Sequence, residues 1–275
     1  MLSHAPRAAC FTAPIIALVL AWSSTAGASQ IDILGNHGAS DPAPSTIINA
    51  TDTAGTTNMG DATNRGANNL LDDALIGAGT PYSQAVQMID ASQAYWNSQQ
   101  PTARGDVGIL LDLGAAYALD ALQLFGYNIA DASGIFTDRT PGSFTIWTAT
   151  DNSAVTTAGG NLLVSDISKF GQQGASQGMS DPGASPTLGE TFLFGGASQP
   201  PEVGGASHAV TGASVEARYL FLRDLTPIET NASDGHIVGL GEIQAYGTAL
   251  PEPSTLVLAG LTALGLARLR RRRLA

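Results

Sequence analysis

The segment GSFTIWTAT at residues 142–150 carries one of the clearest strand patterns in this chain of 275 residues. Phe144, Ile146 and Thr148 alternate with Thr145 and Trp147. Alternation with a period of two is typical of a β-strand that turns one face to the core. We therefore expect a strand here, with Ile146 buried and Thr145 on the opposite, solvent-facing side.

Four further segments, on both sides of this strand, have the same character. They are GILLDLG (108–114), LDALQLFGYN (119–128), ARYLFLRDL (217–225) and GEIQAYG (241–247). In the second of them the leucines, Leu124 among them, alternate with Gln123 and Phe125. Gly, Pro, Asp and Asn separate the segments, which favours antiparallel sheets with one buried face. The sequence therefore predicts an all-β domain at residues 29–248, built as an antiparallel β-sandwich.

Residues 171–214 interrupt this pattern. The segment is rich in Gly, Ser and Pro and holds one short apolar island, TFLF, at 191–194. Such a composition is typical of a loop. We expect a long insertion on the surface, with one edge strand at the apolar island.

The N-terminal residues 1–28 have the pattern of a signal peptide. One arginine precedes the apolar run FTAPIIALVLAW (11–22), and small residues lead up to Ala28. We expect export through the Sec machinery and cleavage by signal peptidase between Ala28 and Ser29; an uncleaved membrane anchor is the alternative. Cys10 is the only cysteine and would leave with the signal, so the mature body contains no disulfide and no cysteine metal site.

The C-terminal residues 251–275, PEPSTLVLAGLTALGLARLRRRRLA, join an apolar run to a basic cluster. The run, at about 254–269, is short for a transmembrane helix, which needs about 20 residues, but local thinning of the bilayer brings it close to a span. Positive charge beyond such a run stops its transfer and keeps the chain end in the cytoplasm. The stop-transfer cluster consists of Arg268, Arg270, Arg271, Arg272 and Arg273.

The rest of the chain is acidic. Asp and Glu number 23 against 12 Lys and Arg, the net charge is −11, and five of the basic residues belong to the tail. Such a surface repels nucleic acid and anionic lipid, and it attracts divalent cations. We therefore expect no nucleic-acid partner.

Pro251, Glu252 and Pro253, followed by an apolar helix and a terminal arginine cluster, resemble the PEP-CTERM sorting signal of Gram-negative bacteria. The resemblance implies that an exosortase, a membrane-embedded transpeptidase-like enzyme, processes the region of the tripeptide. It also implies tethering in the inner membrane, followed by display at the cell surface or release into the extracellular matrix. An ordinary tail anchor is the alternative.

The order of the segments in the body resembles the discoidin, or coagulation-factor C-terminal type, domain. This domain is a galactose-binding-like jelly roll, a fold that also houses many carbohydrate-binding modules. The stretch between Asp73 and Trp96 is longer than in that family, and the insertion at 171–214 is unusual for it. The matching pieces are NLLDD (69–73), YWNS (95–98), ILLDLG (109–114), LQLFGYN (122–128), RTPGSFTIWTATD (139–151), ARYLFLRDL (217–225) and GEIQAYG (241–247).

The resemblance implies a polysaccharide site among the loops at one end of the sandwich, where aromatic rings stack on sugars and polar groups hold their hydroxyls. The candidate ligand-binding residues are Tyr95, Asn97, Tyr127, Asn128 and Arg139. It also implies a calcium ion held by a loop carboxylate, Asp72 or Asp90, and by Glu242 of the last strand. The alternative is that the aspartates are ordinary turn residues and that Glu242 faces solvent.

Catalysis has little support in the sequence. His37, His208 and His236 show no spacing that would place two metal ligands together, and neither H-E-x-x-H nor G-x-S-x-G occurs. We therefore expect no enzyme and no catalytic residue. A structural matrix protein without a defined ligand is the main alternative to a binding module. A glycosidase is the third, since its two carboxylates can lie far apart in sequence.

Overall fold

The computed structural model describes residues 108–126, 139–158, 161–181, 189–200, 204–210, 215–228 and 237–251. It also describes the backbone of 31–32, 89–90, 96–97, 129–131 and 134–136. Several predicted features lie outside these residues: the signal peptide with Ala28 and Ser29, the candidates Asp72, Tyr95, Tyr127 and Asn128, and the tail from Glu252 to Ala275.

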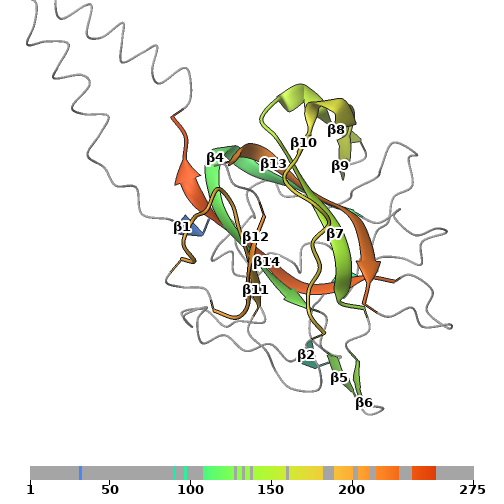
Figure 1. The fold of residues 1–275 in the computed structure, drawn as a ribbon. Helices are drawn as coiled ribbons and strands as arrows, with labels where there is room; N and C mark the ends of the chain where they lie inside the picture. The colour runs from blue at the N-terminus through green and yellow to red at the C-terminus, as the bar shows by residue number, and fades with distance from the viewer. Residues whose placement is uncertain are drawn as a thin grey trace, which may run out of the picture.

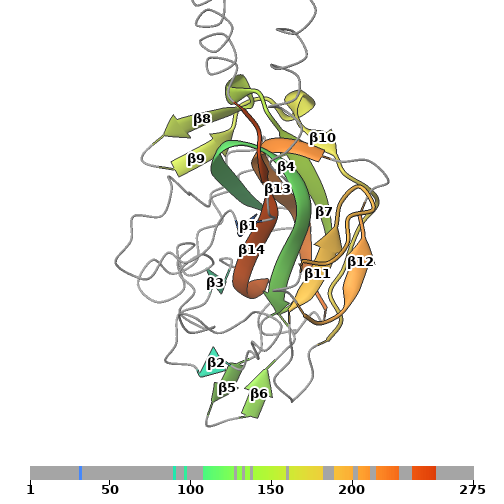
Figure 2. The same cartoon turned by 90° about the vertical axis from the view of Figure 1, so that its left-hand side faces the viewer.

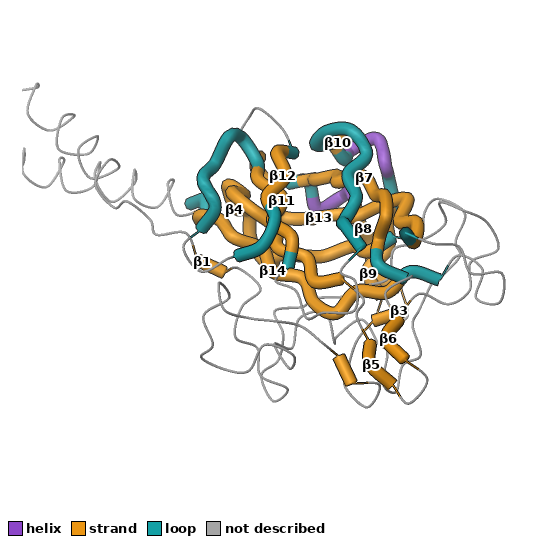
Figure 3. The backbone as a smooth tube through the Cα atoms, turned by 60° about the horizontal axis from the view of Figure 1, so that its bottom comes forward, coloured by secondary structure: helices purple, strands orange, loops and turns teal. Residues whose placement is uncertain are grey.

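The described part of the chain is built from β-strands, with two short 3-10 turns, and this confirms the all-β prediction (Figure 3). The strands of the first half are β1 (Ile31–Asp32), β2 (Ile89–Asp90), β3 (Trp96–Asn97), β4 (Ile109–Gly126), β5 (Ile129–Asp131), β6 (Gly134–Phe136) and β7 (Pro141–Ala149). Those of the second half are β8 (Val155–Ala158), β9 (Asn161–Val164), β10 (Gly171–Gln172), β11 (Glu190–Leu193), β12 (Ser207–Ala209), β13 (Val215–Pro227) and β14 (Gly239–Ala249). The 3-10 turns are η3 (Asn152–Ala154) and η4 (Ile167–Lys169).

Strand β4 links the two halves of the main sheet, whose order is β1-β14-β4-β13-β7-β10 (Figure 1). Its first half pairs with β13, and its second half pairs with β14 and, from Ala121 to Leu124, with β11. The pairing with β13 is interrupted after Asp112, and Gly114 there has a φ of 79°, which glycine adopts without strain. The two strands predicted at 108–114 and 119–128 therefore form one bent strand, which passes from one layer to the other at a corner.

The main core fills the space between these two layers: the first layer consists of the first half of β4 with β13 and β7, and the second of the second half of β4 with β14 and β11. Ile109 and Leu111 from the first half of β4 lie in it together with Leu122 and Leu124 from the second half. The residues that face the core thus have odd numbers in the first half of β4 and even numbers in the second half. This change follows from a bulge at Asp120, which has no partner in the pairing of β4 with β14. Ile146 of β7 and Leu220 of β13 line the same core, so the predicted burial of Leu124 and Ile146 is confirmed.

The expectation of a single buried face is wrong for this sandwich. On the far side of the first layer, Leu110 and Phe221 form a second apolar cluster with Phe170, next to β8, β9 and the two 3-10 turns (Figure 2). On the far side of the second layer, Gln123 and Phe125 are also buried. Each layer is therefore covered on both faces, and a side chain opposite the main core is not automatically exposed.

The Gly/Ser-rich segment 171–214 is not a surface insertion throughout. Residues 171–177 run beside β7, through β10 and a bridge between Gln177 and Phe144. The apolar island forms β11 and pairs with the centre of β4, and Phe192 and Phe194 belong to the main core. Because these rings are buried against both layers, this part of the segment completes the sandwich.

The last strand, β14, spans the sandwich from one end to the other. It begins at Gly239, close to the last residue of β4, and it ends at Ala249, beside the corner of β4. Near its C-terminal end it also pairs with β1, which places Ile31 opposite Gly247. The first and the last strand of the body therefore share one edge of the sheet.

Candidate functional site

Backbone pairing brings three of the predicted ligand-binding segments to the first residues of β14. Gly239 pairs with Asn97 of β3, and the Gly239 N–H donates to the Arg139 carbonyl oxygen at 2.8 Å. The next residue, Leu240, pairs with Gly126, which directly precedes Tyr127 and Asn128 in the chain. Asn97, Arg139 and the chain leading to Tyr127 thus meet at one end of the sandwich.

This end of the sandwich is closely packed below its loops. Thr140 is fully buried, and its carbonyl oxygen accepts a hydrogen bond from the Ile228 N–H at 2.8 Å. A Cβ atom on Gly126 would lie 3.0 Å from the Thr140 side chain, so a larger residue here would press on the 139–141 segment. The half-buried Arg139 therefore stands on a backbone that its neighbours hold in place.

Glu242 lies on β14 near the same end, and the reading that it faces solvent is wrong. Its side chain is completely buried, and its Oε1 accepts a hydrogen bond from Gln244 Nε2 at 2.8 Å. The Gln244 Oε1 in turn accepts from the Tyr246 hydroxyl at 3.2 Å. The three side chains form a buried polar row along one face of β14.

The structure leaves the proposed calcium partners of Glu242 open. Asp72 lies outside the described residues, and Asp90 lies on β2, in the separate sheet β2-β5-β6. Within the part of the chain that is described, no three His, Cys, Asp or Glu side chains gather closely enough to hold a metal ion. A calcium ion there would therefore also need carbonyl oxygens or residues outside the described ranges.

A partly buried ion pair, which the sequence analysis missed, fixes the corner of β4. Asp112 accepts hydrogen bonds from Arg218 Nε at 3.0 Å and Nη2 at 3.2 Å, and also from the Gly114 N–H at 2.9 Å. The hydrogen bonds that Arg218 donates to Asp112 raise the pKa of Arg218, which stays charged. Next to it, burial raises the pKa of Tyr219. The two partners are far apart in sequence, so no local pattern indicates the pair.

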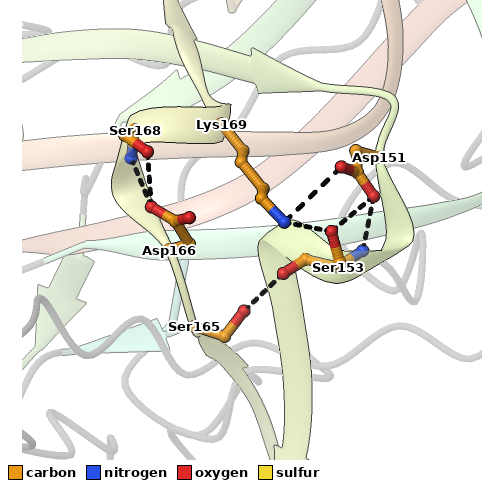
Figure 4. A network of polar contacts seen from close by, with 6 residues as sticks. All are labelled: Asp151, Ser153, Ser165, Asp166, Ser168 and Lys169. Carbon is orange, nitrogen blue, oxygen red and sulfur yellow. Dashed lines mark hydrogen bonds and ion pairs between the residues drawn. The ribbon is translucent and has the colours of Figure 1, made fainter.

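Figure 4 shows a second polar network, where the two 3-10 turns meet on the surface. Asp151 accepts from the Ser153 N–H and hydroxyl, Asp166 does the same with Ser168, and Lys169 Nζ lies 3.6 Å from Asp151 and contacts Ser153. The serine hydrogen bonds lower the pKa of both carboxyl groups. Because the folded-state values are depressed, the stabilisation that they give is present at neutral pH and is lost as pH falls below about 4.

The third polar contact joins β11 to β12. Glu190 Oε2 lies 2.6 Å from His208 Nε2, and Glu190 Oε1 accepts from the Ser180 N–H at 2.8 Å. The imidazole is stacked on Phe192, with ring centroids 5.0 Å apart. The sequence analysis found no metal-ligand spacing at His208; in the structure this residue holds two parts of the 171–214 segment together.

Trp147 lies at the margin of the second apolar cluster. The ring is half-buried, its Nε1 donates to Thr145 Oγ1 at 2.9 Å, and the Arg223 guanidinium lies 5.6 Å from the ring centroid. Thr145 lies on the face opposite Ile146, as predicted, but it is only half-exposed, and its hydroxyl accepts the hydrogen bond of the indole.

The C-terminal residues 249–273 match the model of the PEP-CTERM protein-sorting motif, and this confirms the predicted PEP-CTERM sorting signal. The match begins at the last residue of β14. Among the described residues, no helix is long and apolar enough to cross a membrane; the tail beyond Pro251 lies outside them.

No curated protein matches the chain in sequence. Several solved structures resemble it at low identity. A C-terminal domain of a chitobiase from Bacteroides fragilis is 12% identical, with 70% of this chain and 91% of that chain covered and a TM-score of 0.37. A family 32 carbohydrate-binding module from Clostridium perfringens, in complex with galactose, is 10% identical, with 68% and 88% covered and a TM-score of 0.37. A SusE-like protein is 14% identical, with 69% and 91% covered and a TM-score of 0.39.

Proposed function

We propose that this chain is an exported protein which is tethered in the inner membrane by its tail, sorted by an exosortase, and displayed at the cell surface or in the extracellular matrix. The observation that carries the proposal is the match of residues 249–273 to the PEP-CTERM sorting motif. Its position supports the proposal, because the motif follows directly on the last strand of a folded domain.

Replacing Pro251, Glu252 and Pro253 by alanine should leave the protein in the inner membrane, because the tail would still insert but would no longer be recognised. Cell fractionation with an antibody against the body measures the distribution. Replacing Arg270–Arg273 by lysine is the matched control: it keeps the charge and should leave the distribution unchanged. Unaltered release or surface display in the alanine variant would refute the sorting role.

For the body we propose a binding function directed at envelope or matrix polysaccharide, rather than catalysis. The meeting of Asn97, Arg139 and Gly126 at the first residues of β14 supports this location. The tail leaves the sandwich at the other end of β14. Because this strand has 11 residues, its last residue lies about 30 Å from its first. A site at the first residues would therefore point away from the membrane, where a polysaccharide can reach it.

A polysaccharide array probed with residues 29–250 tests the ligand. We expect binding to at least one polysaccharide and a loss of tenfold or more in the variant Arg139→Ala, because a polar anchor beside the aromatic loop residues is removed. Lys169→Ala is the control, since it removes a cation from the exposed network at η4. Failure to bind any polysaccharide, with sorting intact, would leave the structural matrix role.

We further propose that calcium binds at Glu242 together with Asp72 or Asp90. The buried carboxylate is the oxygen donor that calcium requires, and the further ligands would come from carbonyl oxygens or from residues outside the described ranges. With a Kd near 10 μM, about 1 mM calcium would stabilise the folded state by about 2.7 kcal/mol and raise the melting temperature of residues 29–250.

The variant Glu242→Gln keeps the side-chain shape and should lose most of the calcium shift. Magnesium is the control for diffuse screening of the acidic surface, because it loses its water shell too reluctantly to fill a carbonyl-rich calcium loop. Equal shifts with both ions, or an unchanged shift in Glu242→Gln, would rule out the site.

A further inference from the structure

The sorting motif has no free linker in front of it. Thr248 and Ala249 pair with Ala118 and Tyr117 of β4, and the Leu250 N–H donates to the Ala116 carbonyl oxygen at 2.9 Å. The next residue is Pro251, the first of the tripeptide, and its side chain is exposed. The folded sheet therefore continues up to the residue that immediately precedes the tripeptide.

We propose that the end of β14 controls the rate of processing: the exosortase takes the tripeptide only after residues 248–250 have separated from β4. The inference rests on the proposed function, since it assumes that the tail is processed. The interaction surface is the end of this strand, and its two competing partners are β4 and the sorting enzyme.

The competition follows from backbone hydrogen bonding. A peptide that enters the site of a processing enzyme is extended, and the enzyme binds its main-chain N–H and C=O groups on both sides of the reacting bond. Each backbone group offers one donor or acceptor, and those of 248–250 on the β4 side are already used. The enzyme and β4 therefore cannot hold this segment in the same way at the same time.

The burial of side chains limits how far the strand has to separate. Residues 239–247 of β14 are all buried, whereas Thr248 and Leu250 are half-buried and Ala249 is exposed. Separation of the last three residues thus exposes little apolar surface, whereas separation beyond Gly247 would open the core. Strand ends of this kind open at low cost while the rest of the domain stays folded.

The length of chain between the body and the membrane leaves little room for the enzyme to avoid this competition. Four residues lead from Leu250 to Ser254, where the apolar run begins, and an extended chain spans at most about 14 Å over that distance. The polar layer of the bilayer occupies about 5–8 Å of it. The corner of β4 at Ala116 would therefore be held against the membrane surface until the strand end separates.

Two full-length variants test the inference. A six-residue Gly-Ser linker between Leu250 and Pro251 should speed the conversion of the membrane-bound form, measured by pulse labelling and fractionation, by about tenfold. The matched control is the same linker between Gly195 and Gly196, an exposed turn on the body.

The second variant, Tyr117→Cys with Ala249→Cys, joins two directly opposed residues by a disulfide. It should block conversion until a reductant is added.

Equal conversion rates with and without the linker at 250, or free conversion of the oxidised cysteine variant, would overturn the inference. The alanine variant of the tripeptide separates this failure from a failure of the proposed function. If it stops conversion while the linker has no effect, the sorting role stands and the strand-end control falls. If it does not stop conversion, the sorting role fails, and the inference fails with it.

Discussion

Replacing Phe192 by alanine is expected to lower the free energy of unfolding by about 3–5 kcal/mol. The ring is completely buried in the main core, and its centroid lies 5.3 Å from that of Phe144. Its strand, β11, pairs with the centre of β4, so neighbouring backbone cannot collapse easily into the space left behind. Urea unfolding of residues 29–250 followed by tryptophan fluorescence measures the change.

Leu193→Ala is the matched control on the same strand. Leu193 is half-buried and packs on the opposite side, against Ala121 and Tyr246, so its loss should cost about 1–2 kcal/mol. If Phe192→Ala costs no more than Leu193→Ala, then β11 contributes nothing to the core and the 171–214 segment is a surface insertion after all.

The second large effect is expected at the corner of β4. Asp112→Ala should cost about 2–4 kcal/mol, because Arg218 and the Gly114 N–H both lose their acceptor in a place that water reaches poorly. Removing one partner of a completely buried ion pair costs about 3–5 kcal/mol. We expect a smaller loss here because the Arg218 side chain is 30% exposed, so water compensates part of it.

A double-mutant cycle separates the ion pair from the turn. Asp112→Asn keeps an acceptor for Gly114 but removes the charge, and Arg218→Met keeps the stem of the side chain without the guanidinium. We expect a coupling energy above about 1 kcal/mol between the two positions in urea unfolding. Additive effects would mean that Asp112 acts through Gly114 alone and that the contact with Arg218 is incidental.

Local sequence patterns were sufficient to predict a strand where one spacing of apolar residues continues along the whole strand. The segments at 142–150, 217–225 and 241–247 are found as β7, β13 and β14, because each is a short run with apolar or aromatic residues at alternate positions, bounded by turn residues. The same reasoning failed for Gln123, which is buried because other parts of the chain cover the second face of its layer. Its amide donates to the Gly204 carbonyl oxygen at 3.1 Å, a contact over 81 positions that no alternation reveals.

The apolar island at 191–194 was recognised, but its Gly/Ser-rich surroundings concealed its role. The Gly/Ser-rich composition is a property of the residues that flank β11. The strand itself reaches the core because β13 pairs with β4 only up to Leu119, which leaves the edge of β4 at 121–124 open for β11. The prediction of the candidate site was limited in a similar way, because it depended on contacts between distant segments. The sequence resemblance named Asn97 and Arg139, but only the pairing of both with Gly239 shows that they lie at one end. The pair Glu190–His208 left no signal, since its partners are ordinary polar residues in a loop-like segment.

The pairing of β1 and β4 with β14 determines when this domain can fold. A chain that emerges N-terminus first, from a ribosome or through a membrane, releases β14 last. Until then the second half of β4 has β11 on one side only, and the edge that β14 later covers stays open. Contacts over such sequence separations form slowly. The body therefore spends its synthesis and transport as an open chain with unpaired strand edges, and it needs protection from aggregation until its last eleven-residue strand has arrived.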